Sequence, residues 1–162
     1  MPREYEYRVG HGFDMHRFRR GRKLILGGIE IRHHSGLAGH SDADVLVHAV
    51  INALLGAAGE GDIGSHFPDT DPRYKNIAST KLLSEVLDLI RRKKFQLVNV
   101  DVTVIAQEPK LAPYYNAMKR KLSACLELDP ERVNIKAATT EKLGAIGERK
   151  GMAAAAVVLL RA

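Results

Sequence analysis

The sequence predicts an α+β fold, in which a single domain over residues 1–162 builds one layered, mixed β-sheet with about three helices on one face. Two observations predict it. Segments with apolar residues at alternate positions, typical of strands, are mixed along the chain with segments whose apolar residues recur at helical spacing. These segments do not follow the strict β-α-β order of a parallel sheet, and 162 residues suit a single core.

The chain opens with a predicted strand and hairpin. Tyr5 to Phe13 is expected to be a strand that ends at the Asp14/His16 pair. Leu24–Leu26 and Ile29–Ile31 are expected to form a hairpin, because the two glycines between them allow a tight turn.

A helix is expected next, from about Asp42 to Ala57, with Ser41 or Asp42 as its N-cap. The glycines of residues 59–64 should end it, and Phe67 to Pro72 should form a rigid, acidic loop.

The second half predicts two more helices and three more strands. Leu82, Leu83, Val86, Leu87 and Ile90 form the apolar stripe of the first of these helices. The expected elements are a helix at Ser79–Arg92, a strand at Phe95–Ala106, a helix opened by Pro109–Pro113 and reaching Leu126, a strand at Val133–Ala138, a turn at Thr139–Gly144 and a strand at Met152–Leu160.

The composition is that of a soluble globular protein, with 45% hydrophobic and 27% charged residues. No apolar run approaches the roughly 20 residues that span a bilayer. Cys125 is the only cysteine and no apolar leader follows Met1, so we expect a cytoplasmic protein without a membrane partner.

The net charge of +6 suits a polyanionic partner. Its densest basic run, Arg91 to Lys94, falls where a helix should end, and cations there complement the helix dipole. Aromatic residues are only 6% and Trp is absent, which leaves little for base stacking. We therefore expect a small polyanionic substrate rather than a nucleic acid.

Asp14, His16 and His48 are candidate metal ligands. Residues i and i+2 of a strand point to one face, so Asp14 and His16 can reach the same ion. An Asp with two His residues is a three-ligand set of the kind that catalytic zinc uses, with one open position. The residues alone leave a second interpretation open, in which His48 is a buried core histidine of its helix.

His40 and Ser41 precede a helix N-terminus, where backbone N–H groups favour anions. They are candidates for holding a phosphate. The alternative is that Ser41 only caps the helix and His40 lies on the surface.

Four further residues are candidates for phosphate chemistry. Glu141 could complete a magnesium ion bound by phosphates, with the preceding threonines as phosphate ligands, and Lys110 could be a phosphate-binding ammonium. An exposed turn and an ordinary first-turn lysine explain the same residues.

Taken together, these segments resemble the 2-C-methyl-D-erythritol 2,4-cyclodiphosphate synthase family of the non-mevalonate isoprenoid pathway. The resemblance covers nearly the whole chain in the family's order. The matching stretches are Arg8 to His16, Ala38 to Asp44, Gly61 to Gly64 with Phe67 to Pro72, Asn99 to Thr103, Gln107 to Lys110, and Thr139 to Gly144.

The resemblance implies a cyclising lyase. The 2-phosphate of 4-diphosphocytidyl-2-C-methyl-D-erythritol 2-phosphate attacks the β-phosphorus of its own diphosphate and expels CMP. The implied cofactors are one Zn²⁺ per subunit and a Mg²⁺ or Mn²⁺ ion with the diphosphate. The implied assembly is a homotrimer with its active sites between subunits.

The resemblance also assigns roles to residues. Asp14, His16 and His48 match the zinc ligands, Glu141 matches the ligand of the second ion, and His40 and Thr139 match the positions that stabilise the transition state. The residues that match the erythritol and phosphate wall are Ser41, Asp62, Ile63, Gly64, Phe67, Pro68, Asp69, Thr70 and Asp71. Those that match the cytidine and phosphate pocket are Ala106, Lys110, Leu111, Ala112, Ala138 and Thr140.

Four positions depart from the family pattern. Asn52 stands where an Asp is common behind His48, and Ala138 replaces a Thr. Glu148 and Ala155 stand where the family has an Arg and a Glu at a central cavity that can hold an isoprenoid diphosphate, although Arg149 or Lys150 could substitute for the missing Arg.

Two other functions use the same features. A zinc-dependent phosphate-ester hydrolase would share the Asp14/His16/His48 site but would need a water as fourth ligand and a general base. A nucleotide-binding module would account for the positive charge without catalysis.

Overall fold

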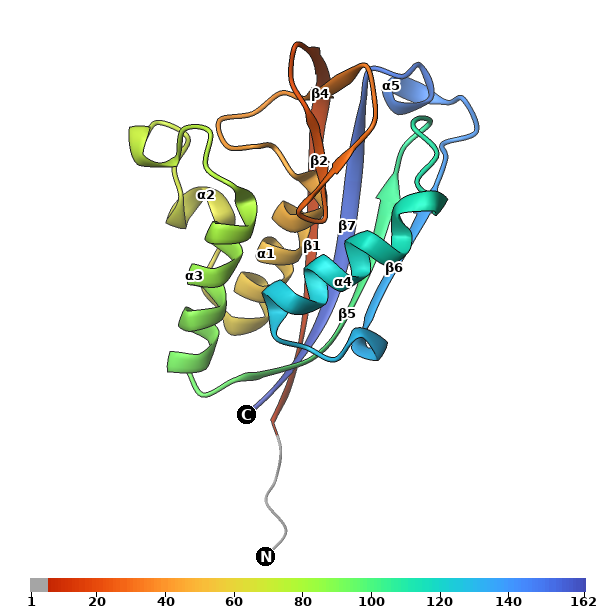
Figure 1. Cartoon of the computed structure of the whole chain (residues 1–162). Helices are drawn as coiled ribbons and strands as arrows, with labels where there is room; N and C mark the ends of the chain where they lie inside the picture. The colour runs from red at the N-terminus through yellow and green to blue at the C-terminus, as the bar shows by residue number, and fades with distance from the viewer. Residues whose placement is uncertain (1–5) are drawn as a thin grey trace, which may run out of the picture.

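A computed structural model of the protein describes residues 6–162 and confirms the α+β class. Three long helices lie along one side of a mixed sheet (Figure 1). The strands are β1 (Tyr7–Arg20), β2 (Leu24–Leu26), β3 (Ile29–Ile31), β4 (Ser35–Leu37), β5 (Gln96–Ile105), β6 (Val133–Ala138) and β7 (Gly151–Arg161). The helices are α1 (Val45–Ala58), α2 (Ile63–His66), α3 (Ser79–Arg92), α4 (Tyr115–Leu126) and α5 (Gly144–Gly147), with 3-10 turns η1 (Pro72–Tyr74), η2 (Ala112–Tyr114) and η3 (Pro130–Arg132).

The main sheet has the strand order β4-β1-β7-β5-β6. Its neighbours are antiparallel except for β5 and β6, which run parallel, and β2 and β3 pair only with each other. Because β5 and β6 are parallel, their carboxyl ends meet at one edge of the sheet, where Ile105 lies beside Ala138.

The first strand is longer than predicted. It pairs with β7 as far as Arg17 and then changes partner, pairing with β4 from Phe18 to Arg20. The prediction that it ends at Asp14 and His16 was therefore wrong, because a second partner takes over the strand. Tyr5, the predicted first residue, lies outside the described residues.

The central helix α1 is buried on almost every side, between the sheet and α3. A helix that is apolar all round is typical of a core position. It begins at Val45, three residues later than predicted, because the side chain of Asp44 accepts a hydrogen bond from the Val47 N–H and caps it. Ser41 and Asp42, the predicted caps, lie in the preceding loop.

The hairpin is confirmed at the predicted residues, and Gly27 and Gly28 both have positive φ, as its tight turn requires. Asp44 also holds this hairpin in place, since its carboxylate accepts hydrogen bonds from both glycine N–H groups at 3.0 and 2.7 Å. Burial and the neighbouring Asp42 carboxylate raise the pKa of Asp44 to about 6.

The remaining predictions differ from the structure mainly at their ends. Helix α3 and strand β6 begin and end at the predicted residues, and β5 and β7 do so within one residue. The Pro109–Pro113 segment leads into the turn η2, and α4 begins only at Tyr115. Short elements were missed, namely β4 and the single-turn helices α2 and α5.

Among residues 6–162, no helix combines the length and the apolar character needed to cross a membrane.

The side of the sheet away from the helices carries exposed apolar side chains. Along β1, residues that face α1 are buried or half-buried, whereas Val9, Phe13 and Met15 are exposed, and Val157 of β7 joins them.

Candidate active site

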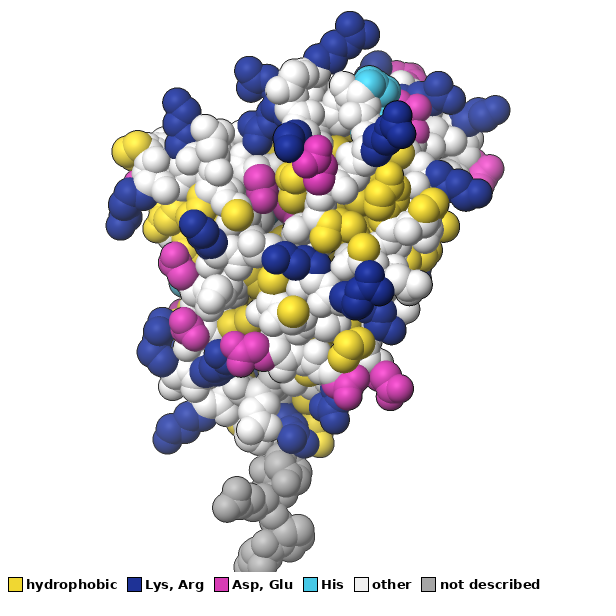
Figure 2. Space-filling model, in the orientation of Figure 1, with side chains coloured by type: hydrophobic (Ala, Val, Ile, Leu, Met, Phe, Trp, Pro, Cys, Tyr) yellow, Lys and Arg dark blue, Asp and Glu magenta, His cyan; other side chains and the backbone are white. Residues whose placement is uncertain are grey.

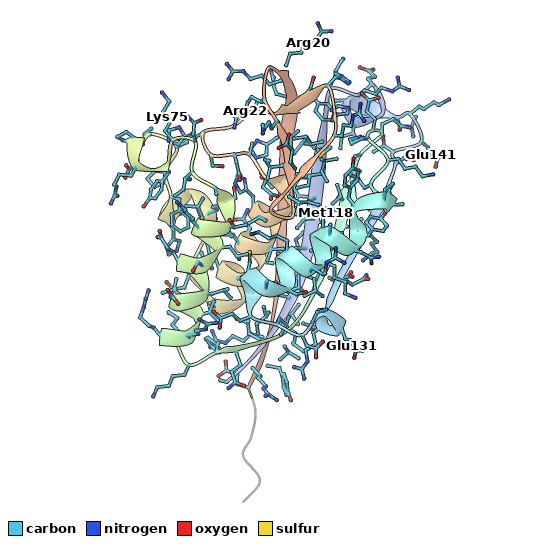
Figure 3. The ribbon with its side chains drawn as sticks, viewed as in Figure 1. Arg20, Arg22, Lys75, Met118, Glu131 and Glu141 are labelled. Carbon is cyan, nitrogen blue, oxygen red and sulfur yellow. The ribbon has the colours of Figure 1, made fainter. Side chains whose placement is uncertain are left out.

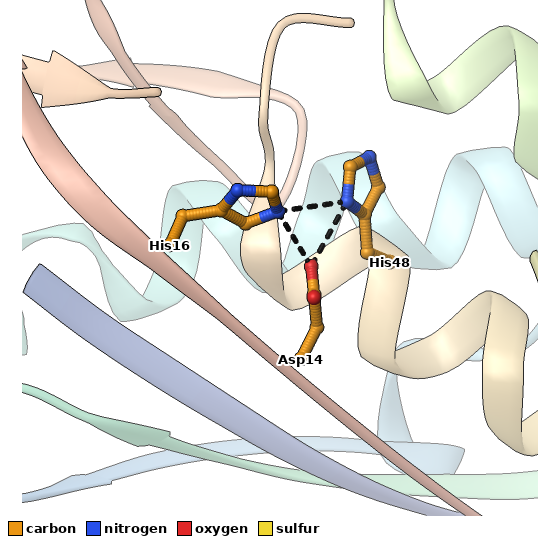
Figure 4. A group of neighbouring side chains, drawn as sticks. All are labelled: Asp14, His16 and His48. Carbon is orange, nitrogen blue, oxygen red and sulfur yellow. Dashed lines mark hydrogen bonds and ion pairs between the residues drawn. The ribbon is translucent and has the colours of Figure 1, made fainter. Parts of the chain in front are cut away.

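Asp14, His16 and His48 converge at one point between β1 and α1. The Asp14 Oδ2 atom lies 2.8 Å from His16 Nε2 and 2.9 Å from His48 Nδ1, and the two nitrogens are 3.3 Å apart (Figure 4). The expectation that Asp14 and His16 share a face of the strand is confirmed, since the ligand atoms of all three side chains meet.

Two glycines bring the helix close enough for this meeting. A Cβ atom built on Gly12 would lie 1.9 Å from the carbonyl oxygen of Ala49, and one on Gly10 would lie 1.9 Å from that of Ala53. The backbone of α1 therefore rests directly on the backbone of β1. This contact sets how far His48 reaches toward the strand.

Both imidazoles are held from behind by hydrogen bonds. His16 Nδ1 lies 2.6 Å from the carbonyl oxygen of Ala38, which accepts its proton. His48 Nε2 lies 2.8 Å from Ser79 Oγ and 3.1 Å from Ser41 Oγ, and Ser79 Oγ in turn donates to Asp42. These contacts fix both rings so that the other nitrogen of each ring faces Asp14.

The surroundings favour an ionised Asp14. Burial alone would raise the pKa of this carboxyl, but the hydrogen bonds from His16 and His48 outweigh burial and hold its pKa below the ordinary range. For His16, burial lowers the pKa, whereas the hydrogen bond to Asp14 outweighs it and raises the pKa overall. Without a metal, Asp14 accepts hydrogen bonds from both imidazoles, and a bound metal ion would take the place of the protons in these hydrogen bonds.

This donor set fits a divalent transition metal. One carboxylate oxygen and two imidazole nitrogens at these separations match a three-ligand catalytic zinc site, and the backbone and serine contacts supply the outer hydrogen bonds that such ligands need.

A cleft of about 410 Å³ opens over the three residues. Tyr74 and Leu82 also line it, and neither was predicted, because both lie outside the stretches that resemble the family. The predicted residues that line it are His40, Ser41, Ile63, Gly64, Phe67, Pro68 and Asp69.

The other predicted residues of this wall have local roles. Asp62 caps α2 by accepting from the Ser65 N–H at 2.9 Å, and the hydrogen bonds from Ser65 lower the pKa of Asp62. Asp71 caps η1, its pKa is lowered by Arg73, and its backbone oxygen accepts from His40 Nε2 at 2.8 Å. Thr70 is exposed beside Asp71.

Arg22 is a residue of this region that sequence reasoning missed. Its guanidinium donates to the carbonyl oxygens of Gly39 and Ser41, at 2.7 and 2.5 Å, and so holds the turn that carries His40. A second, basic cleft of about 630 Å³ lies on this side and is shared by Arg22, His40 and Lys75. The only sequence signal was the run of basic residues between the first strand and the hairpin.

The remaining predicted residues gather elsewhere, at the carboxyl ends of β5 and β6. Thr139 and Glu141 contact each other, with Oγ1 and Oε1 3.3 Å apart, and Thr140 Oγ1 donates to the Leu143 carbonyl. Thr139, Glu141 and Lys110 are exposed. Ala106, Leu111, Ala112 and Ala138 lie in the same region, where the Ala106 N–H donates to the Ala138 oxygen.

These two groups of residues do not meet within one chain. In the described part of the chain, none of the residues from Ala106 to Ala112 or Ala138 to Glu141 lines the cleft over Asp14. In Figure 3, Glu141 lies at the right of the molecule, whereas Lys75 and Arg22 lie to the left of it.

The side-chain hydrogen bonds of Asn52 involve residues other than His48. Its side-chain oxygen accepts from the Ile63 N–H at 2.9 Å, and its amide nitrogen lies 3.5 Å from the Phe13 carbonyl oxygen. Asn52 therefore links α2 to β1, while the serines orient His48.

The basic residues form no single stripe on the face shown in Figure 2, where Lys and Arg alternate with Asp and Glu. Arg91, from the densest basic run, pairs with Asp88 and Glu127 at the end of α3, and Lys93 pairs with Glu60. Helix α3 ends at Arg92, so the run lies at a helix end, as predicted.

Comparison with known proteins gives a family and close relatives. The YgbB family model matches residues 7–161. The chain is 56% identical over 155 residues to the 2-C-methyl-D-erythritol 2,4-cyclodiphosphate synthase of Geobacillus thermodenitrificans, covering 96% of this chain and 97% of the relative.

Solved structures of similar proteins have the same fold as this chain. The bifunctional IspDF of Campylobacter jejuni matches with a TM-score of 0.94 and 47% identity, over 98% of this chain but only 43% of that longer chain. A CDP complex of IspF from Plasmodium falciparum matches with a TM-score of 0.83 and 34% identity, over 95% of each chain.

Proposed function

The chain belongs to the YgbB family, and we propose that it catalyses the reaction after which its relatives are named, with residues 1–162 working as one domain. The 2-phosphate of 4-diphosphocytidyl-2-C-methyl-D-erythritol 2-phosphate attacks its own β-phosphorus. A new P–O–P bond closes the cyclic diphosphate, and the bond to the bridging oxygen of the α-phosphate breaks, so CMP leaves with that oxygen. The observation that carries the proposal is the Asp14, His16 and His48 cluster at the base of a cleft.

The main obstacle to this reaction is that two anionic phosphates must approach each other. The chain's own contribution is positioning, because a bound and oriented substrate reacts as an intramolecular system. Asp14, His16 and His48 would hold a zinc ion, which when bound supplies Lewis-acid polarisation of a substrate phosphate. His40, fixed through its hydrogen bond to the Asp71 carbonyl, would orient the phosphates above this point.

The nucleotide half of the site would come from a neighbouring copy of the chain. A related structure binds CDP, which supports a cytidine nucleotide as the ligand. Residues expected to bind it, among them Lys110 and Thr139, are exposed and lie away from the cleft over Asp14. Glu141 would hold a Mg²⁺ or Mn²⁺ ion together with the diphosphate, which neutralises the departing CMP.

A homotrimer would bring the two halves together. The exposed apolar side chains of β1 and β7, including Val9, Phe13 and Val157, offer a surface for association. Closed rings form when one surface of a subunit meets a different surface of the next.

The test of the reaction is product analysis with the diphosphocytidyl substrate. We expect equal amounts of CMP and a cyclic diphosphate, identified by ³¹P NMR. Release of CMP with a linear phosphate would instead identify a phosphate-ester hydrolase. Absence of CMP from a folded, zinc-loaded protein would contradict both activities and leave a nucleotide-binding module.

The shared site is tested by mixing subunits that are impaired in opposite halves of the site. Co-expression of H48A with E141Q should restore activity, since a site pairing the cluster of one variant with Glu141 of the other is complete. In a random ring about a quarter of the sites meet this condition. Activity no higher than in either parent would show that both halves act within one chain.

A further inference from the structure

A second cluster of possible metal ligands lies outside the site described above. His33 and His34, in the loop between β3 and β4, approach Glu108, in the segment that follows β5. One nitrogen or oxygen of each of these three side chains lies within 4.8 Å of the others. Neither the proposed reaction nor the family resemblance assigns a role to these three side chains, although Glu108 lies in the Ala106–Ala112 segment that is expected to bind the nucleotide.

The most informative member is His33. Its side chain is only 7% exposed, and its Nε2 atom is buried without a hydrogen-bond partner among residues 6–162. Its other nitrogen, Nδ1, lies 2.8 Å from the Ser35 carbonyl oxygen and 3.3 Å from the Ser35 N–H. The shorter contact requires a proton on Nδ1, so Nε2 carries either a lone pair, as a metal ligand needs, or the second proton of a charged ring.

This nitrogen faces a carboxylate. His33 Nε2 lies 3.5 Å from Glu108 Oε1, and the two atoms face each other without forming a direct hydrogen bond. Such an arrangement is stable when a positive charge lies between the atoms. Two ligands of one tetrahedral zinc ion are about 3.3 Å apart, given metal–ligand distances of about 2.0–2.2 Å. The observed separation is close to that value.

The neighbouring side chains are compatible with a bound cation. The His34 ring packs on that of His33 with centroids 4.1 Å apart and is exposed, so it can supply a third nitrogen from the solvent side. Arg149 lies 3.4 Å from the other oxygen of Glu108, Oε2, which leaves Oε1 for the ion. The hydrogen bond from His33 Nδ1 to a backbone carbonyl is the outer contact that metal-bound histidines commonly make.

We propose that His33, His34 and Glu108 form a second binding site for a divalent transition metal of the zinc class, with an open position toward solvent. An ion there would tie the β3–β4 loop to the segment from Ala106 to Ala112. That effect on the segment matters for catalysis only if the segment binds the nucleotide, as proposed above. Metal binding itself does not depend on the proposed reaction.

Counting bound zinc tests the site. Metal-free protein is dialysed against a buffered micromolar concentration of Zn²⁺, and the bound metal is measured by atomic spectrometry. We expect two equivalents per chain in the wild type, and one each in E108Q, H34A and H48A. The double variant H48A/E108Q should bind none. H66A, which removes a histidine outside both clusters, should keep two.

A second measurement guards against variants that fail to fold. In the H48A background, Zn²⁺ should raise the midpoint of thermal unfolding, because a ligand that binds only the folded state stabilises it. The same addition should leave the midpoint of H48A/E108Q unchanged. One zinc per wild-type chain, or a second zinc that survives both E108Q and H34A in folded protein, would overturn the proposal. Loss of turnover without loss of this zinc would count only against the proposed reaction.

Discussion

The two groups of predicted site residues differ sharply in how the chain holds them. Asp14, His16 and His48 lie on the longest strand and on the most buried helix, and each imidazole has its second nitrogen fixed by a hydrogen bond. Thr139 and Glu141 lie in an exposed turn, and their hydrogen-bond contacts are with each other.

This difference indicates which half of the site is complete in one chain. A metal cluster must be held rigidly, because small displacements of a ligand lower affinity, and the core of the fold provides that rigidity. The exposed turn that carries Thr139 and Glu141 has few contacts within its own chain, so its side chains would be fixed by a neighbouring subunit or by the substrate. The nucleotide half should therefore depend on assembly and substrate much more than the metal half does.

Substitution of His48 by alanine should have the largest effect. H48A removes a ligand that the rest of the cluster cannot replace, so turnover should fall by about 10³-fold or more, which is about 4 kcal/mol. Zinc bound at this site should be lost while the circular dichroism spectrum stays that of the wild type. H66A is the matched control. Full activity in H48A would mean that the ligand set is wrong.

Substitution of Gly12 by alanine should come next, and it tests whether the metal half depends on the strand–helix contact. The added Cβ would overlap the Ala49 carbonyl, so G12A should lower the free energy of unfolding by about 3 kcal/mol and weaken zinc binding. Chemical denaturation measures the first effect. G56A is the control, because a Cβ on Gly56 of α1 would meet only the His11 oxygen at 3.8 Å. Equal stability of the two variants would contradict the close-contact argument.

Substitution of Glu141 by glutamine should affect catalysis without affecting stability. E141Q keeps the shape of the side chain but removes its charge, so turnover should fall by about 10- to 100-fold and more added Mg²⁺ or Mn²⁺ should be needed. Zinc content and the unfolding midpoint should not change. E131Q, on the exposed turn η3 at the opposite end of β6, is the control (Figure 3). An unchanged metal-response curve in E141Q would remove Glu141 from the site.

Substitution of Asn52 should have the smallest effect. In N52D the acceptor for the Ile63 N–H remains, so both stability and turnover should stay within about 0.5 kcal/mol of the wild type. N52A removes that acceptor and should cost about 1 kcal/mol of folding free energy. A large loss of zinc in N52D would show that this position acts on His48 after all.

The sequence predicted the parts of the fold that depend on local pattern. Helix α3 has a clear apolar stripe, and strand β6 is bounded by a proline turn and by threonines. The ends of both elements could therefore be predicted from the sequence. The three residues of β4 carry no such pattern, because this strand exists only as the partner of Phe18 to Arg20. Its formation depends on tertiary contact.

In the site, too, the features that follow from local sequence pattern were predicted, and those that depend on tertiary contact were not. The i, i+2 spacing placed Asp14 and His16 on one face, and helical spacing placed His48 within reach. The helix start was misjudged because three residues, Ser41, Asp42 and Asp44, are all good caps, and the sequence does not show that the Asp44 side chain is the one that accepts from the Val47 N–H. Arg22 was missed because its partners are backbone oxygens, which leave no trace in a sequence.

The glycines at positions 10 and 12 have a consequence for redesign. Because main chain touches main chain beneath the cluster, the distance from β1 to α1 is the same whatever side chains project from them. A shorter side chain in place of His48 would not reach the metal, because the backbones cannot move closer. A longer side chain would extend past the metal position, because the backbone contact holds the helix where it is. The scaffold therefore fixes the distance between the strand and the helix. A change of metal preference has to come from ligand side chains of similar length to His48 that carry different donor atoms.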